Sequence, residues 1–98
     1  MNFRLSFTLE AKEKLAELKG SPHLEKRFKA VVKALNFLRT NPRYPGLQTH
    51  EFTSLKGPAN EKVYEAYAEQ NTPAAYRIFF YYGSKKGEMV IVTIITHP

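Results

Sequence analysis

The last quarter of the chain constrains the fold most, because it contains two long runs of β-branched and aromatic residues. The first run is AAYRIFFYY at 74–82 and the second is EMVIVTIITHP at 88–98, with GSKKG between them. Runs of this composition, joined by a short glycine-bounded turn, are typical of a β-hairpin. Two polar side chains interrupt the apolar pattern, Arg77 within the first strand and His97 at the end of the second.

The N-terminal half predicts one strand followed by two helices. Residues 2–7 alternate between apolar and polar side chains, as a half-buried strand does. From Thr8, a favourable helix cap, apolar residues recur at helical spacing up to Gly20, and Ser21-Pro22 begins a second helix that Asn41-Pro42 ends. Because so few residues separate the two helices, we expect an antiparallel helical hairpin.

The C-terminal half predicts a three-stranded meander. Residues 41–60 are irregular, with a short strand allowed within 51–55, and residues 62–68 form the strand that precedes the hairpin. The predicted order is β-α-α-β-β-β, and no crossover helix separates the later strands, so the fold class is α+β. We expect one domain over 1–98, in which the N-terminal strand joins a mainly antiparallel sheet and the helices cover one face.

Turn lengths determine which strand residues face one another. Five-residue turns at 69–73 and 83–87 place Glu65 opposite Arg77, and Arg77 opposite Thr93. Side chains alternate between the faces of a strand, so these three residues and His97 are predicted to share one face. The face under the helices is predicted to hold Tyr64, Tyr76, Ile78, Phe80, Val90, Val92 and Ile94. A second turn one residue shorter would move His97 to the helix side.

Composition limits the partners that this chain can have. Fifteen Lys and Arg against nine Asp and Glu give a formal charge of +6, which favours polyanionic partners such as RNA, DNA or an acidic protein. Many small basic domains nevertheless bind no nucleic acid. Cysteine is absent, and no apolar run approaches the ~20 residues of a membrane span. No signal-peptide pattern opens the sequence, so we expect a cytoplasmic protein with no membrane association.

The polar row on the uncovered face holds groups that can bind a phosphate and transfer protons. The planar, permanently charged fork of Arg77 matches phosphate, and His97 is suited to proton transfer. Glu65 either acts as the base or holds Arg77 in place. The structural alternatives are an ordinary Glu65–Arg77 ion pair and a His97 with no role.

Basic and aromatic residues near this row are candidate contacts for RNA. Tyr81 and Phe79 share the predicted face of Arg77, and their rings can stack on bases. The predicted nucleic-acid-binding set is Arg43, Lys56, Lys62, Tyr81, Lys85 and Lys86. Solvated lysines and ordinary aromatic packing are the alternatives. The three histidines lack metal-ligand spacing, so we expect no metal and no cofactor.

Four segments in a fixed order resemble the RelE/ParE superfamily of toxins from bacterial toxin–antitoxin pairs. They are LKG at 55–57, VYEAYAE at 63–69, AYRIFFYY at 75–82 and VIVTIITHP at 90–98. The resemblance is closest to the RelE and YoeB branches, whose members cut messenger RNA on the ribosome. It implies a RelE-like fold, in agreement with the order of elements predicted above.

The resemblance also implies roles for individual residues. The arginine of the motif R-[IL]-x-[FY]-Y corresponds to Arg77, which family members use to stabilise the phosphate. A histidine after the last strand of the YoeB branch corresponds to His97, the general acid. A glutamate just before an LKG-like segment serves catalysis in YoeB-like toxins, and Glu51 lies near that place. Glu65 and Glu51 are therefore both candidates for the base.

The function implied by the resemblance is that of a metal-independent endoribonuclease, an mRNA interferase acting on ribosome-bound mRNA and neutralised by a cognate antitoxin. Cleavage by transesterification needs a base for the 2′-hydroxyl proton, a cation for the pentacovalent phosphate and an acid for the leaving 5′-oxygen. Two alternatives stay open. One is a ParE-like, non-catalytic inhibitor of a DNA topoisomerase, and the other is a degenerate member that only binds its antitoxin. Whether the chain is an enzyme therefore stays open, and so does the formation of a homodimer.

Overall fold

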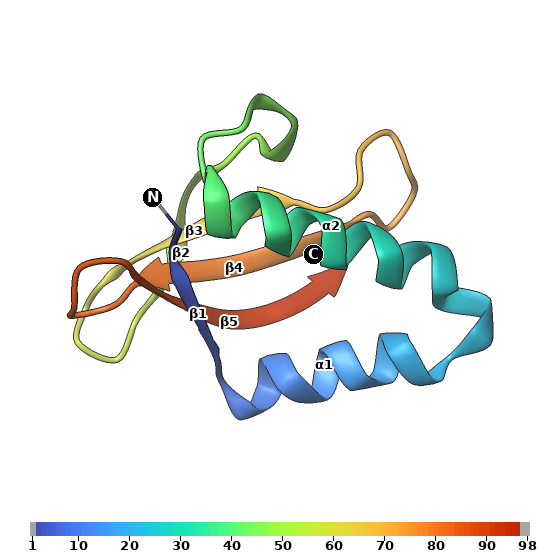
Figure 1. Cartoon of the computed structure of the whole chain (residues 1–98), viewed down its shortest axis with the longest axis horizontal. Coiled ribbons are helices and arrows are strands. Elements are labelled where there is room, and N and C mark those ends of the chain that lie inside the picture. The colour runs from blue at the N-terminus through green and yellow to red at the C-terminus, as the bar shows by residue number, and fades with distance from the viewer. Residues whose placement is uncertain (1, 97–98) are drawn as a thin grey trace.

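The computed structural model describes residues 2–96, in which five strands and two α-helices form two layers (Figure 1). The elements follow the order β1 (Arg4–Phe7), α1 (Leu9–Gly20), α2 (Glu25–Thr40), β2 (His50–Lys56), β3 (Lys62–Tyr67), β4 (Tyr76–Tyr82) and β5 (Glu88–Thr96). Short 3-10 turns at Pro22–Leu24 and Pro45–Leu47 precede α2 and β2. Neither helix is long and apolar enough to cross a membrane.

The strands form one mixed sheet in the order β1-β5-β4-β3-β2. β2, β3, β4 and β5 are antiparallel neighbours, and β1 lies parallel to β5 at the opposite edge from β2. The α+β class, the meander and the participation of the N-terminal strand are confirmed. The predicted order β-α-α-β-β-β gains one strand, because the short strand allowed within 51–55 is a full edge strand, His50–Lys56.

Both helices pack on one face of the sheet and build the core there (Figure 1). Thr8 caps α1, since its side chain accepts a hydrogen bond from the Ala11 amide at 3.1 Å. The Thr8 hydroxyl also donates to the Val92 carbonyl at 2.7 Å, which attaches the start of α1 to β5. The buried side chains of α2 are Val31, Ala34, Leu35 and Leu38, which recur at helical spacing along one face.

The predicted pairing of β3 with β4 was wrong by two residues. Arg77 lies opposite Tyr67, and Glu65 lies opposite Phe79. The Ala68 amide donates to the Tyr76 carbonyl, so the connecting turn spans 69–75 and not 69–73. A shift by two positions keeps every side chain on its predicted face, because the side-chain period of a strand is two.

The pairing of β4 with β5 contains a bulge that the sequence did not reveal. Phe79 lies opposite Thr93, whereas the next residue, Phe80, lies opposite Ile91, so Val92 is the extra residue. The predicted core positions Val90 and Val92 were wrong, and Met89 and Ile91 lie in the core in their place. Beyond the bulge the parity returns to the predicted one: Ile94 is a core residue, and Thr93 lies opposite Phe79 on the other face.

Candidate functional site

A row of polar side chains is buried on the face of the sheet that the two described helices leave uncovered. Glu65 of β3 is 2% exposed, Arg77 of β4 is 8% exposed and Thr93 of β5 is 5% exposed. The Arg77 Nε lies 3.5 Å from Glu65 Oε2, so the two charges form a buried ion pair. The shared face is as predicted from strand alternation, but the side chains are buried there and not open to solvent. His97, the fourth member of the row, lies outside the described residues.

Arg77 is held by its neighbours yet has unfilled hydrogen-bonding capacity. Its guanidinium lies over the ring of Tyr67, with Cζ 3.6 Å from the ring centroid, in the arrangement that a cation–π contact favours. Nε and Nη1 are buried, and neither has a hydrogen-bond partner within residues 2–96; the Thr93 hydroxyl is in the same condition. A buried donor without an acceptor costs about 1–3 kcal/mol, so this arrangement favours an incoming anion.

His50 of β2 joins this cluster, and sequence analysis did not identify it. It lies directly opposite Glu65 in the sheet, and its Nε2 is 2.8 Å from Glu65 Oε1. About half of the His50 side chain is exposed, so it connects the buried carboxylate with solvent. The short strand allowed at 51–55 indicated that an edge strand can form here, but the register that places His50 opposite Glu65 depends on pairing with β3.

The hydrogen bonds of His50 determine which of its ring nitrogens carries a hydrogen. Nδ1 lies 2.8 Å from the Gln48 carbonyl, which only accepts, so Nδ1 carries a hydrogen. Nε2 faces a carboxylate at 2.8 Å, and this contact needs one proton, carried either by the ring or by Glu65. The His50–Glu65 pair is therefore a place where a proton can be held or released beside Arg77.

A cavity of about 430 Å³ opens beside Arg77. Tyr67 and Arg77 line it, together with Gln70, Asn71 and Thr72 of the turn between β3 and β4. Gln48, which is hydrogen-bonded to Gln70 at 3.3 Å, also lines it. Amide, hydroxyl, aromatic and guanidinium groups thus surround one hollow, which is the set of contacts that a nucleotide uses.

The other predicted catalytic carboxylate is not part of this cluster. Glu51 pairs with Tyr64, a residue packed against the core under the helices, and successive side chains of a strand point to opposite faces. Its carboxylate lies 3.7 Å from the Lys56 ammonium. Glu51 and Lys56 therefore form an exposed ion pair that is separate from Glu65 and Arg77.

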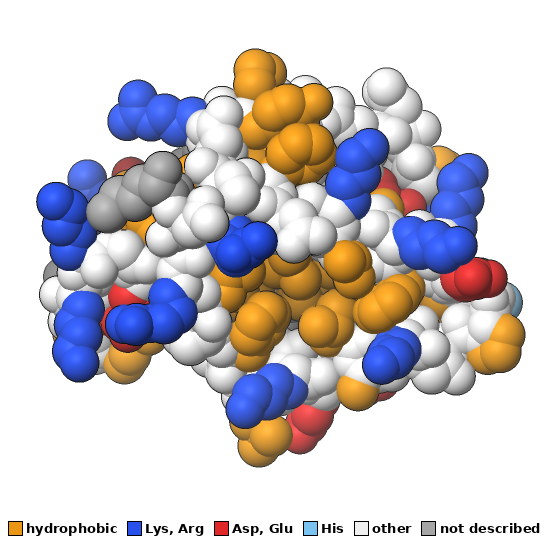
Figure 2. All heavy atoms as spheres, in the orientation of Figure 1, with side chains coloured by type: hydrophobic (Ala, Val, Ile, Leu, Met, Phe, Trp, Pro, Cys, Tyr) orange, Lys and Arg blue, Asp and Glu red, His pale blue; other side chains and the backbone are white. Residues whose placement is uncertain are grey.

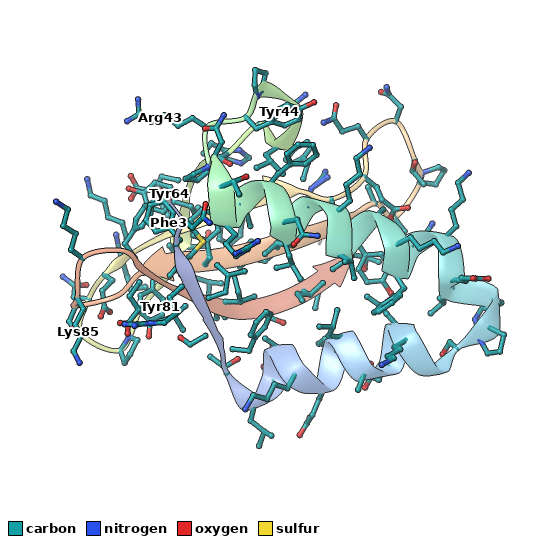
Figure 3. The ribbon with its side chains drawn as sticks, viewed as in Figure 1. Phe3, Arg43, Tyr44, Tyr64, Tyr81 and Lys85 are labelled. Carbon is teal, nitrogen blue, oxygen red and sulfur yellow. The ribbon has the colours of Figure 1, made fainter. Side chains whose placement is uncertain are left out.

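The predicted nucleic-acid-binding residues are dispersed. Lys62 and Lys56 face each other in the register of β2 and β3, and Lys85 and Lys86 are exposed in the turn between β4 and β5. In Figure 3, Lys85 and Tyr81 lie toward that turn, away from Arg43 and Tyr44. Phe79 packs edge-on against Phe52 at 4.9 Å and is buried, so its ring serves the fold.

Arg43 borders a second, aromatic cleft of about 420 Å³. Tyr44, Tyr64 and Tyr82 line this cleft, which His50 also borders. Burial raises the pKa of Tyr82 above its ordinary value of 10.0, and Tyr64 raises it further, whereas the charge of Arg43 lowers it. Tyr82 therefore stays neutral in the folded protein at a pH where the unfolded chain ionises it.

The raised pKa of Tyr82 predicts a loss of stability in strong alkali. Between pH 10.0 and the higher pKa of the folded state, only the unfolded chain loses this proton, so stability falls as pH rises. We expect Tyr82→Phe to flatten the decline in urea midpoint between about pH 9 and about pH 11. An unchanged decline in this variant would contradict the assignment. Tyr81→Phe serves as the matched control.

Basic side chains dominate the helix-side surface. In Figure 2, Lys and Arg side chains are spread around this face, with few acidic ones among them, and hydrophobic side chains gather in the region between α1 and α2.

Within residues 2–96, no group of three or more His, Cys, Asp or Glu side chains is placed to hold a metal ion.

Comparison with known proteins shows the fold of this chain. No protein-family model matches the sequence, and no curated protein matches it either. Three solved structures match along nearly the whole length of both chains. The YoeB/ParE toxin from Agrobacterium tumefaciens matches with a TM-score of 0.71 and 9% identity, over 98% of this chain and 100% of that chain. The archaeal RelE-RelB complex from Pyrococcus horikoshii matches with a TM-score of 0.65 and 14% identity, over 98% of this chain and 96% of that chain. The toxin–antitoxin complex RelBE2 from Mycobacterium tuberculosis matches with a TM-score of 0.53 and 16% identity, over 99% of this chain and 100% of that chain.

These matches confirm the predicted RelE-like fold. Identities of 9–16% over the full chain mean that the likeness lies in the arrangement of the elements. The chain thus has the fold of RelE/ParE-superfamily toxins.

Proposed function

We propose that this chain, with the RelE/ParE toxin fold, is a toxin that cleaves ribosome-bound mRNA by metal-independent transesterification. One observation carries the proposal: the buried guanidinium of Arg77 lines a nucleotide-sized cavity, with Nη1 lacking an acceptor within residues 2–96. A phosphate bound there gains a charge-assisted hydrogen bond in a site of low dielectric. The His50–Glu65 pair supplies a proton acceptor next to the same cation.

Each step of the proposed reaction has a candidate group. The carboxylate of Glu65, with His50, takes the proton of the 2′-hydroxyl, and the 2′-oxygen forms a bond to phosphorus. Arg77 stabilises the charge of the pentacovalent phosphate. The 5′-oxygen then leaves with a proton from His97, so the products are a 2′,3′-cyclic phosphate and a 5′-hydroxyl. Glu51 has no part in this scheme, because it lies on the other face of β2 in an ion pair with Lys56.

The proposed protein partner is an antitoxin. Two of the matched structures are toxin–antitoxin complexes, and the basic charge of this chain favours an acidic partner. A short neighbouring reading frame with an acidic, amphipathic tail would support such a pair.

Controlled expression in bacteria tests the proposed activity. We expect growth arrest after induction, together with new 5′ ends inside translated reading frames, mapped by primer extension. With the purified chain and ribosomes, magnesium-saturated EDTA removes transition metals but leaves the magnesium that the ribosome needs. It should leave the cleavage rate unchanged, since no step uses a transition metal bound to the chain.

Two other results would each overturn the ribonuclease. Intact mRNA with induction of the DNA-damage response would identify a ParE-like topoisomerase inhibitor. Normal growth with intact mRNA and intact DNA would identify a chain that only binds its antitoxin. The three outcomes differ in which nucleic acid is damaged, so one induction experiment separates them.

A further inference from the structure

The turn between β3 and β4 forms the cavity wall beside Arg77, and its backbone is unusual. Asn71 and Ala74 have φ values of 56° and 53°, in the left-handed region. Asn tolerates this conformation, whereas for alanine it costs about 1–2 kcal/mol. A turn with this backbone holds its shape only when neighbouring groups fix it.

Arg27 of α2 makes four contacts with this turn and its flanks. Its Nη1 donates to the Ala74 carbonyl at 2.9 Å, and its Nη2 donates to the Pro73 carbonyl at 3.1 Å. Its Nε lies 3.9 Å from Glu69 Oε1, and Cζ lies 5.5 Å from the centre of the Tyr76 ring. The guanidinium of Arg27 therefore links the strained Ala74 to α2, which packs on the face of the sheet opposite to Arg77.

Other contacts hold the first half of the turn. The Glu69 carboxylate accepts a hydrogen bond from the Tyr76 amide at 3.1 Å, which closes the base of the turn. The Gln70 side chain donates to the Gly46 carbonyl and accepts from Gln48 Nε2 at 3.3 Å. The segment before β2 thus fixes one side of the turn, and Arg27 fixes the other.

We infer that Arg27 is a positioning residue, which holds the 69–75 turn as a preformed wall for the nucleotide whose phosphate lies on Arg77. This inference rests on the proposed function. Arg27 touches no substrate itself, because its guanidinium is occupied by Pro73, Ala74 and Glu69. Its effect passes through the turn to Asn71 and Thr72, which line the cavity.

The test compares Arg27→Met with a matched control. Methionine keeps an unbranched stem against Tyr76 but removes the hydrogen bonds and the charge. Lys29→Met also removes one positive charge from α2, at an exposed residue that forms an ion pair with Glu25 in the same helix, 3.3 Å away. The probe is a single-stranded oligoribonucleotide, 2′-O-methylated throughout so that it binds without being cut. Binding is measured by fluorescence anisotropy well below the melting temperature of each variant.

We expect Arg27→Met to weaken binding of the probe on the order of tenfold, and Lys29→Met to change it by less than about twofold, the screened effect of one distant charge. Hydrogen exchange of the 69–76 amides should accelerate in Arg27→Met alone. Adding Ala74→Gly to Arg27→Met should restore part of the lost affinity, because glycine adopts the left-handed conformation at no steric cost.

Contrary outcomes distinguish the two proposals. If Arg27→Met lowers the melting temperature but leaves exchange in the turn and RNA affinity unchanged, Arg27 is only structural and the inference is overturned. If exchange accelerates but affinity matches that of the control, the turn is not the nucleotide wall. If the wild-type chain cleaves no mRNA on purified ribosomes, the proposed function fails, and with it the nucleotide role of the turn, while the exchange data still decide whether Arg27 holds the turn. If it cleaves mRNA on ribosomes but binds no free probe, the inference about the turn is overturned and the proposed function stands.

Discussion

Replacement of Arg77 by methionine is expected to abolish growth inhibition and to lower the rate of mRNA cleavage about 10²–10³-fold, the usual effect of removing a group that stabilises transition-state charge. Methionine keeps much of the apolar stem that packs over Tyr67 but cannot bind phosphate. The measurement is single-turnover cleavage of a translated mRNA on purified ribosomes, with circular dichroism as the check of folding.

Arg77→Lys separates charge from geometry. Lysine keeps the positive charge, but as a compact ammonium that lacks the planar fork. We expect a rate between those of the wild type and Arg77→Met. A folded Arg77→Met variant that still arrests growth and cuts mRNA at the wild-type rate would exclude the proposed mechanism.

The second large effect is expected on stability, from neutralising Glu65. Removing one partner of a buried ion pair leaves the other charge uncompensated, at a cost of roughly 3–5 kcal/mol. Glu65 and Arg77 are both buried, and Nε lies 3.5 Å from Oε2. We therefore expect Glu65→Gln to lower the free energy of unfolding by about 3 kcal/mol, measured by urea denaturation.

A double variant tests whether the lost stability comes from the stranded charge. In Glu65→Gln with Arg77→Met, no guanidinium is left buried without its carboxylate. We expect the double variant to be more stable than Glu65→Gln alone, although it is inactive. If the losses in free energy of unfolding of the two single variants simply add in the double variant, the two side chains do not interact. The ion pair would then give no support to the candidate site.

The shared face of Glu65, Arg77 and Thr93 could be predicted from the sequence because strand alternation is a local property. The turn before β4 is two residues longer than predicted, and an error of two leaves the faces unchanged. The bulge at Val92 could not be predicted. Its carbonyl bonds to the Thr8 hydroxyl, a contact between residues 84 positions apart, and no local pattern encodes it.

The partnership of His50 with Glu65 was missed for a related reason. Residues 41–60 contain several proline and glycine residues, so their composition predicts loop, and the edge strand forms because β3 presents backbone groups for pairing. The register that places His50 opposite Glu65 is set by this long-range pairing. Individual charges such as Arg77 could be found from the sequence, whereas the proton-holding pair required the fold.

The parallel pairing of β1 with β5 has a consequence for how the protein is made. β1 is the first strand of the described sheet in sequence, but its hydrogen-bonding partner β5 is the last. The sheet therefore cannot be completed until β5 has been made, and pairing strands so far apart in sequence slows folding. Arg77 and Thr93 reach their positions only after β5 joins the sheet. A chain in which β5 has not yet paired therefore lacks the assembled row of Glu65, Arg77 and Thr93.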